Sequence, residues 1–155
     1  MMVTSLRMIF LLLYLVIVSQ GIFYLFAVSK AYSNISMPTY AEQRNAIDLV
    51  ITPRLKVVYL TSLLIGIAII ILTYKNPRCW AFISTNIAFV CLIIEISLAV
   101  KYNMPINVKF NAYAVSNHTQ DWKALRHTWL QMIEYRGVLQ VIGFLGLLFG
   151  IGYRE

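Results

Sequence analysis

The sequence has few charged residues. Only 12% of its 155 residues are charged and 60% are hydrophobic, whereas about a quarter of the residues in a typical soluble domain are charged. This composition excludes an ordinary soluble domain and predicts an integral membrane protein. The net charge of +7 does not indicate a nucleic-acid partner, because basic membrane proteins are common and no basic face interleaved with aromatic residues stands out.

Cysteine and histidine are also scarce, with two of each. Cys79 and Cys91 fall on one predicted helix about 18 Å apart at helical rise, which is too far for a disulfide. No CxxC motif occurs, and His118 and His127 do not have a standard ligand spacing. We therefore expect no metal and no other cofactor; the minor alternative is a haem or copper centre at His127.

Four apolar segments predict an all-α, integral membrane four-helix bundle that forms one domain over residues 1–155. We expect the spans at about residues 6–29, 54–74, 80–101 and 122–153, because about 20 helical residues cross a hydrocarbon core of roughly 30 Å. The fourth segment spans only if its polar beginning enters the bundle at the bilayer edge. A domain of this size leaves no room for a soluble catalytic domain.

With four spans, both termini and the Tyr74–Cys79 connection lie on one side of the membrane. A count of Lys and Arg alone would place the two longer connections in the cytoplasm. Several of those basic residues are also candidates for a site inside the bundle, so the short basic connection is the clearer signal. We expect both termini in the cytoplasm, in the cell membrane if the protein is bacterial.

The connection between the first two spans is predicted to contain a short surface helix. Thr39 and Glu42 have the spacing of a capping box. Apolar residues then recur at helical intervals up to Pro53: Tyr40, Ile47, Val50 and Ile51. This pattern is typical of an amphipathic helix lying on the membrane surface, and it equally suits a connector without a functional role.

Glu95 lies inside the third predicted span, on a helix face shared with Ser84, Ala88 and Cys91. An ionised carboxylate in hydrocarbon costs at least about 2.5 kcal/mol, so Glu95 should face the bundle interior. It has two readings: a catalytic group, or a counter-charge for an arginine of the fourth helix. Gln20 and Asn86, also inside spans, are predicted to form hydrogen bonds between helices.

The fourth helix carries a polar and aromatic stripe. At about 100° per residue, six residues fall within about 40° of one line: Trp122, Arg126, Trp129, Ile133, Arg136 and Gln140. An outward stripe would anchor the helix at the membrane interface. Because Arg136 and Gln140 lie deeper than an interfacial belt, an inward stripe is favoured. Gly143, Gly146 and Gly150 lower on this helix predict close helix packing.

Together these residues resemble a known family. Asn103-x-Pro105-x-Asn107, then Trp122-x-x-x-Arg126-x-x-Trp129 and Arg136 seven residues on, is similar to the anthrone oxygenase-like family of small four-span membrane proteins, largely defined as a domain of unknown function. The segment from Gln43 to Pro53 resembles its surface helix, so the resemblance covers nearly the whole chain. Two features depart from it: Glu134 and Tyr135 precede Arg136, where the family often has Asn or His, and Glu95 has no assigned counterpart.

The resemblance implies an oxygenase-like enzyme that acts on a hydrophobic aromatic substrate, such as an anthrone or quinol, without an evident cofactor. On this hypothesis Arg126 and Arg136 stabilise the substrate anion, and Glu95 or His127 accepts the proton. The expected substrate-binding residues are Asn103, Asn107, Trp122, Trp129, Gln140 and Gln43.

The alternative is a non-enzymatic membrane binding or assembly protein. In this reading the Asn/Trp/Arg cluster is a structural clasp that fastens the chain after the third span onto the fourth helix, with Asn103 and Asn107 satisfying backbone groups where a helix ends at Pro105. A cavity of several hundred Å³ beside Arg126 and Arg136 would distinguish an enzyme from a clasp. Expected partners are membrane lipid, a hydrophobic aromatic molecule and a second copy in a homo-oligomer; a transporter would require such a dimer.

Overall fold

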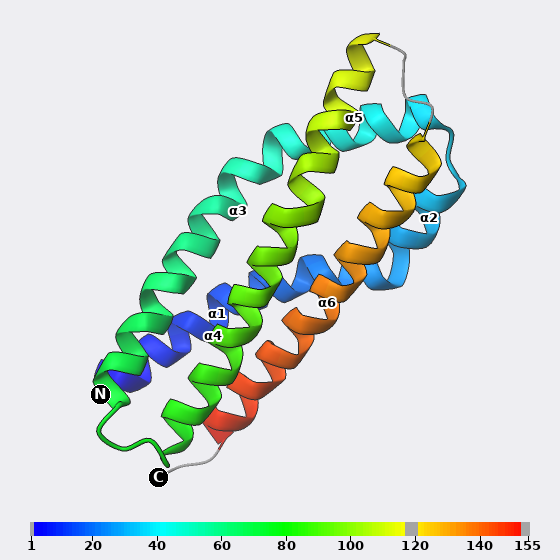
Figure 1. The fold of residues 1–155 in the computed structure, drawn as a ribbon. Coiled ribbons are helices and arrows are strands. Elements are labelled where there is room, and N and C mark those ends of the chain that lie inside the picture. The colour runs from blue at the N-terminus through cyan, green and yellow to red at the C-terminus, as the bar shows by residue number, and fades with distance from the viewer. Residues whose placement is uncertain (1, 117–120, 153–155) are drawn as a thin grey trace.

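The computed structural model describes residues 2–116 and 121–152, and these residues form a bundle of four long helical segments without a strand (Figure 1). The segments are, in chain order, α1 (Met2–Phe23) with η1 (Tyr24–Val28) and α2 (Ser29–Asn34); α3 (Met37–Thr73); α4 (Trp80–Leu98) with η2 (Ala99–Asn103) and α5 (Met104–Ser116); and α6 (Trp122–Gly152). Each is long and apolar enough to cross a membrane. The predicted all-α four-helix bundle is confirmed.

The first and third helical segments run further than the predicted spans, to Asn34 and Ser116. The prediction that the third helix ends at Pro105 is wrong. Pro105 directly follows the π-helical turn η2, whose last hydrogen bond runs from the Met104 amide to the Ala99 carbonyl. A wider turn of this kind absorbs the misfit at a proline, which cannot make the α-helical bond, and the helix continues.

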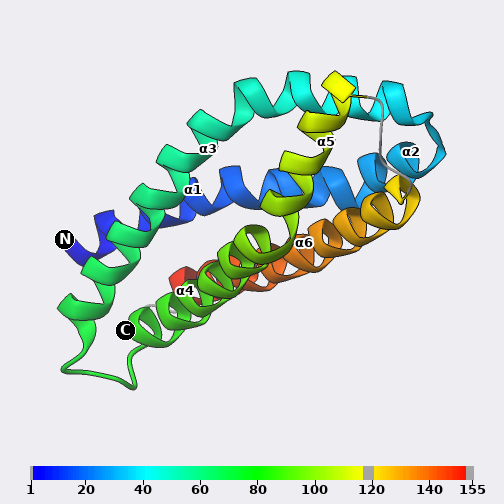
Figure 2. The same ribbon diagram turned by 45° about the horizontal axis from the view of Figure 1, so that its top comes forward.

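The predicted surface helix is present as the first part of α3, and it is continuous with the second span. It begins at Met37, earlier than the capping-box spacing suggests, because Ser36 is extended and its hydroxyl lies 2.9 Å from that of Thr39, with Pro38 in the first turn. Figures 1 and 2 show that α3 bends in its upper half. The helix contains one internal proline, Pro53, and proline is the usual cause of a bend in a helix. Residues 37–52, the arm, cross one end of the bundle.

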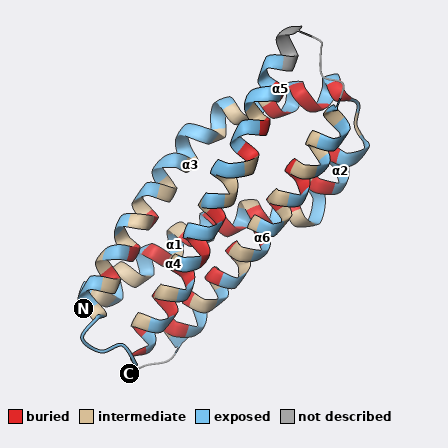
Figure 3. Ribbon diagram, viewed as in Figure 1, coloured by how far each residue is buried: buried red, intermediate tan, exposed pale blue. Residues whose placement is uncertain are grey.

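The buried side chains form two clusters along the bundle. The cluster toward the termini contains Phe10, Tyr14, Ile17, Ile69, Ala88, Leu92 and Leu147. The cluster beneath the arm is rich in aromatic residues and contains Tyr24, Tyr32, Met37, Tyr40, Ala41, Ile106, Phe110, Trp129, Leu130 and Ile133. Figure 3 shows buried residues facing neighbouring helices and exposed ones facing outward. The outward faces are largely apolar, which is the pattern of helices surrounded by lipid.

Small residues set the closest helix approach. A Cβ atom added to Gly21 would lie 2.9 Å from the Gly137 Cα and 2.1 Å from the Gln140 Oε1, so α1 and α6 cross there almost backbone to backbone. A Cβ atom at Gly143 would lie 2.0 Å from the Tyr14 hydroxyl. The predicted packing role of Gly143 is confirmed, and this crossing holds Gln140 directly against α1.

Candidate functional site

Glu95 is at the centre of a buried hydrogen-bond network that joins α3, α4 and α6. Its side chain is 1% exposed. One carboxyl oxygen, Oε1, accepts from Arg136 Nε at 2.9 Å and Nη2 at 2.7 Å, from Gln140 Nε2 at 2.7 Å and from the Tyr59 hydroxyl at 2.8 Å. The pair of Glu95 and Arg136 is therefore both charge-paired and hydrogen-bonded, as a buried ion pair must be.

The placement of Glu95 agrees with part of the sequence analysis. The helix face that it shares with Ser84, Ala88 and Cys91 is buried, and Arg136 is the arginine whose charge it balances. The sequence did not point to Tyr59, because it lies in the apolar second span. Two acceptors in this network, Glu95 Oε2 and Gln140 Oε1, are buried and have no hydrogen-bond partner among the described residues.

A second set of hydrogen bonds connects η2 and α5 to α6. Arg136 Nη1 donates to Asn103 Oδ1 at 3.2 Å, Asn103 Nδ2 donates to the Trp129 carbonyl at 3.1 Å, and Trp129 Nε1 donates to Asn107 Oδ1 at 2.7 Å. Trp129 and Gln140 are each 2% exposed, so this part of the stripe on α6 faces inward as predicted. The contacts are those expected of a clasp, although they hold a helix instead of the predicted loop.

Arg126 lies apart from this network, at the connection between α2 and α3. Its guanidinium donates to the carbonyls of Ile35 at 2.7 Å and Ser33 at 2.8 Å, and it stacks over the Trp122 ring at 4.6 Å. These carbonyls end α2 and lack helical partners. Arg126 therefore fastens the connection between α2 and α3 to α6.

The arm carries a buried arginine that sequence reasoning did not identify. Arg44 is 3% exposed, pairs with Asp48 one turn later, and lies over the Trp129 ring at 4.3 Å. The i,i+4 spacing of the two charges was the available signal. Gln43, the residue predicted to bind substrate, is exposed and lies outside the network. Arg44, not Gln43, is the polar contact of the arm with the bundle interior.

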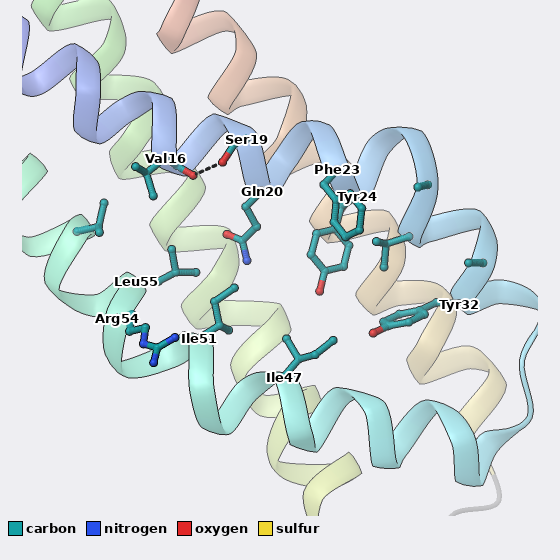
Figure 4. A pocket seen from close by; sticks show the side chains of 14 residues that line it. Val16, Ser19, Gln20, Phe23, Tyr24, Tyr32, Ile47, Ile51, Arg54 and Leu55 are labelled. Atoms are coloured by element: carbon teal, nitrogen blue, oxygen red, sulfur yellow. Dashed lines mark hydrogen bonds between the residues drawn. The ribbon is translucent and has the colours of Figure 1, made fainter.

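A cavity of about 750 Å³ opens on the side of the bundle between α1 and α3 (Figure 4). Nine of its lining residues are apolar, including Phe23 and Ile47 at the exposed rim. Figure 4 shows Gln20, Tyr24 and Tyr32 directed toward its interior. Its remaining polar members are Ser19, which bonds to its own helix, and Arg54.

Among the polar residues that line this cavity, Gln20 has a side-chain atom without a protein partner among the described residues. Gln20 Oε1 is buried without a hydrogen-bond partner in the described part of the chain. The predicted interhelical bond of Gln20 is thus not found, and Asn86 bonds only to the Phe82 carbonyl of its own helix. The Tyr24 ring rests on Trp129 with centroids 5.7 Å apart, so one wall of the cavity is backed by the clasp.

Neither Arg126 nor Arg136 lines the cavity between α1 and α3, so this cavity is not the one expected beside the two arginines. The cavity lies next to the Glu95 network all the same. Val58 lines the cavity and Tyr59 donates to Glu95, while Gln20 lines it and Gly21 contacts Gln140.

His127 lies on another face of the bundle. It is exposed and lines a separate cavity of about 420 Å³ between α2 and α6, together with Lys30 and Glu134. It therefore does not approach the Glu95 network, as its angular offset from the stripe predicted. Within residues 2–116 and 121–152, no cluster of three or more His, Cys, Asp or Glu side chains has an arrangement that could hold a metal ion. His118 lies outside the described residues.

Comparison of the chain with protein-family models, curated proteins and solved structures finds no match. Its assignment therefore rests on the geometry above: a helical bundle with four helices able to cross a membrane, a buried hydrogen-bond network around Glu95 and a cavity between α1 and α3.

Proposed function

We propose that this membrane protein binds a hydrophobic aromatic molecule in the cavity between α1 and α3, with the Asn/Trp/Arg cluster acting as a structural clasp behind it. The observation that carries the proposal is Gln20 Oε1, a buried acceptor without a partner in the described residues, on a side chain that faces a largely apolar cavity. An unpaired buried acceptor costs about 1–3 kcal/mol. A ligand hydroxyl that donates to this oxygen would remove the cost.

The composition of the cavity supports an aromatic ligand. Phe23, Tyr24 and Tyr32 contribute rings to its lining, and aromatic pairs add about 0.5–1.5 kcal/mol beyond the area that they bury. Small-molecule sites are mostly apolar cavities of about 300–1,000 Å³ with a few convergent polar groups. The exposed rim between α1 and α3 would admit such a molecule sideways from the bilayer.

The clasp assignment is supported by the hydrogen bonds that the two arginines form within the protein. Arg136 donates to Glu95 and Asn103, and Arg126 donates to two backbone carbonyls. Side chains committed in this way are poorly suited to a first contact with a ligand. In the proposed arrangement they keep α6 and the arm in position, and so support the Tyr24 wall of the cavity through Trp129.

Fluorescence titration with anthracene-9-methanol, a neutral aromatic alcohol, tests the proposal in detergent micelles. Ala27 lines the cavity, and Ile22 is exposed on the same helix without lining it. Ala27→Trp should abolish saturable binding, Ile22→Trp should leave it unchanged, and Gln20→Leu should weaken it at least tenfold. Equal binding by all three variants would mean that the alcohol enters the micelle or another surface, and would overturn the proposal.

Oxygenase-like chemistry is the second candidate, and the unpartnered Glu95 Oε2 is the observation that favours it. In this hypothesis the carboxylate takes a proton from the methylene carbon of an anthrone-like substrate. Molecular oxygen then adds to the resulting carbanion, Glu95 returns the proton to the terminal oxygen, and loss of water from the hydroperoxide, with the second C–H hydrogen, leaves a quinone carbonyl. Arg136 would stabilise the anion from the far side of Glu95.

Oxygen uptake and quinone absorbance with anthrone as substrate test this second candidate. Glu95→Gln should reduce turnover at least 100-fold, whereas Glu134→Gln, which alters a carboxylate in the separate cavity, should not. Binding of anthracene-9-methanol by the Glu95 variant would show that its cavity is intact. Equal turnover by both variants and the unaltered protein would contradict a catalytic Glu95.

We also propose that both termini face the cytoplasm. The start of α1, the end of α6 and the connection between α3 and α4 lie at the same end of the bundle (Figure 1), and that short connection carries Lys75 and Arg78. Labelling of a cysteine introduced at Asn76, in a background without Cys79 and Cys91, by a membrane-impermeant maleimide should occur only after cells are broken. Labelling in intact cells would reverse the orientation.

A further inference from the structure

Arg54 is a cation at the edge of the α1–α3 cavity, and no acidic residue balances it there. The lining contains Arg54 but neither Asp nor Glu. Among the residues that the structure describes, Arg54 has no salt bridge and no hydrogen bond from its side chain. The contrast with Arg44, Arg126 and Arg136 is clear, because each of those guanidinium groups has a protein partner.

We propose that Arg54 binds a negatively charged oxygen group of the ligand, so that the cavity prefers an aromatic acid over a neutral alcohol or quinol. This inference rests on the proposed function, because it specifies the charge of the ligand in the same cavity. The apolar rings occupy the interior beside Tyr24, a ligand hydroxyl meets Gln20, and the acidic group remains at the edge beside Arg54.

The position of Arg54 suits this role. It directly follows Pro53, the proline inside α3 that comes after the arm, so it lies at the beginning of the second span. A guanidinium group presents two parallel N–H donors to a carboxylate. Their attraction is stronger beside an apolar cavity than in bulk water, because the local dielectric constant is lower.

Lys56 provides a matched comparison two residues further along α3. It is exposed, as Arg54 is, but it does not line the cavity. Two residues correspond to a rotation of about 200° on a helix, so the two cations face different sides of α3. A general attraction of anions to a basic membrane surface would involve both residues, whereas a built site would involve Arg54 alone.

The test compares anthracene-9-carboxylate, at a pH where it is ionised, with anthracene-9-methanol in neutral micelles. In the unaltered protein the acid should bind at least tenfold more tightly than the alcohol. Arg54→Gln should remove that preference without changing the affinity for the alcohol, and Arg54→Lys should retain part of it. Lys56→Gln should behave as the unaltered protein does, and Ala27→Trp should abolish binding of both probes.

Two results would overturn the inference separately from the proposed function. If Ala27→Trp abolishes binding of the alcohol but the unaltered protein binds the acid no more tightly than the alcohol, the cavity binds ligand and Arg54 does not select for a negative charge. If Lys56→Gln weakens the acid as much as Arg54→Gln does, the preference is a property of the surface. If neither probe shows binding sensitive to Ala27→Trp, the proposed function itself fails, and this inference fails with it.

Discussion

The two sides of the bundle place a glutamine differently: both side chains have an Oε1 atom without a partner in the described residues, but only Gln140 donates to other helices and only Gln20 lines the cavity. On the side of α4 and α6, Gln140 donates to Glu95 at 2.7 Å and to the Tyr59 hydroxyl at 3.3 Å. On the side of α1 and α3, Gln20 faces a cavity and its Oε1 has no partner in the described residues. A polar side chain inside a membrane helix needs a hydrogen-bond partner. If another helix supplies the partner, the side chain contributes to packing, and if a ligand supplies it, the side chain contributes to binding.

Charge follows the same division. Arg136 is held by Glu95 and Asn103 and belongs to the interior of the fold, whereas Arg54 stands at a cavity edge without an acidic neighbour in its lining. The residues that the sequence pattern singled out lie mainly on the side of α4 and α6, in hydrogen-bond networks within the protein. The cavity formed instead beside residues that the pattern ranked low or did not include.

The largest loss of stability is expected from Arg136→Ala, on the side of α4 and α6. This substitution leaves the buried Glu95 carboxylate without its counter-charge, and removing one member of a buried pair costs about 3–5 kcal/mol of unfolding free energy. Reversible unfolding in mixed micelles measures it. The double variant Glu95→Leu/Arg136→Met should recover most of the loss, because no unpaired charge remains; a double variant as unstable as the single one would argue against the ion-pair explanation.

A smaller loss is expected from Gly21→Ala, which acts where the two sides meet. The new methyl group would collide with the Gly137 backbone and with Gln140, and overpacking of this kind costs about 1–3 kcal/mol. Gly152→Ala is the control, since among the described residues no atom beyond its own stretch of helix lies within 4 Å of the added methyl group. The same unfolding assay compares them, and equal stability would show that α1 and α6 do not cross as closely as described.

The smallest changes in stability are expected from replacing each of the two glutamines by leucine, and these two variants should differ clearly from each other. Gln140→Leu removes a donor to Glu95 and should lower the unfolding free energy by about 1–3 kcal/mol. Gln20→Leu removes an acceptor that has no protein partner, so stability should stay level or rise slightly. Only Gln20→Leu should weaken anthracene-9-methanol binding without destabilising the protein. If Gln140→Leu and Gln20→Leu lowered the unfolding free energy equally, the two glutamines would not differ in their contribution to the fold.

The sequence predicted the inward stripe on α6 because helical geometry determines which residues share a face. It also predicted that Glu95 needs a partner, because a lone carboxylate in hydrocarbon is costly. It did not predict Tyr59 or Arg44 as participants. Tyr59 sits in an apolar span of α3, and nothing in its own neighbourhood shows that this face meets Glu95 of α4.

Local rules explain what the sequence determined by itself: the number of long helices, their apolar character and the faces that carry polar groups. These depend on residues within a few turns of each other. Tertiary structure alone decided which arginines have protein partners, that the helix continues past Pro105, and that a cavity opens between α1 and α3. Those outcomes depend on the rotation and separation of helices distant in sequence, which packing at contacts such as Gly21 against Gly137 sets.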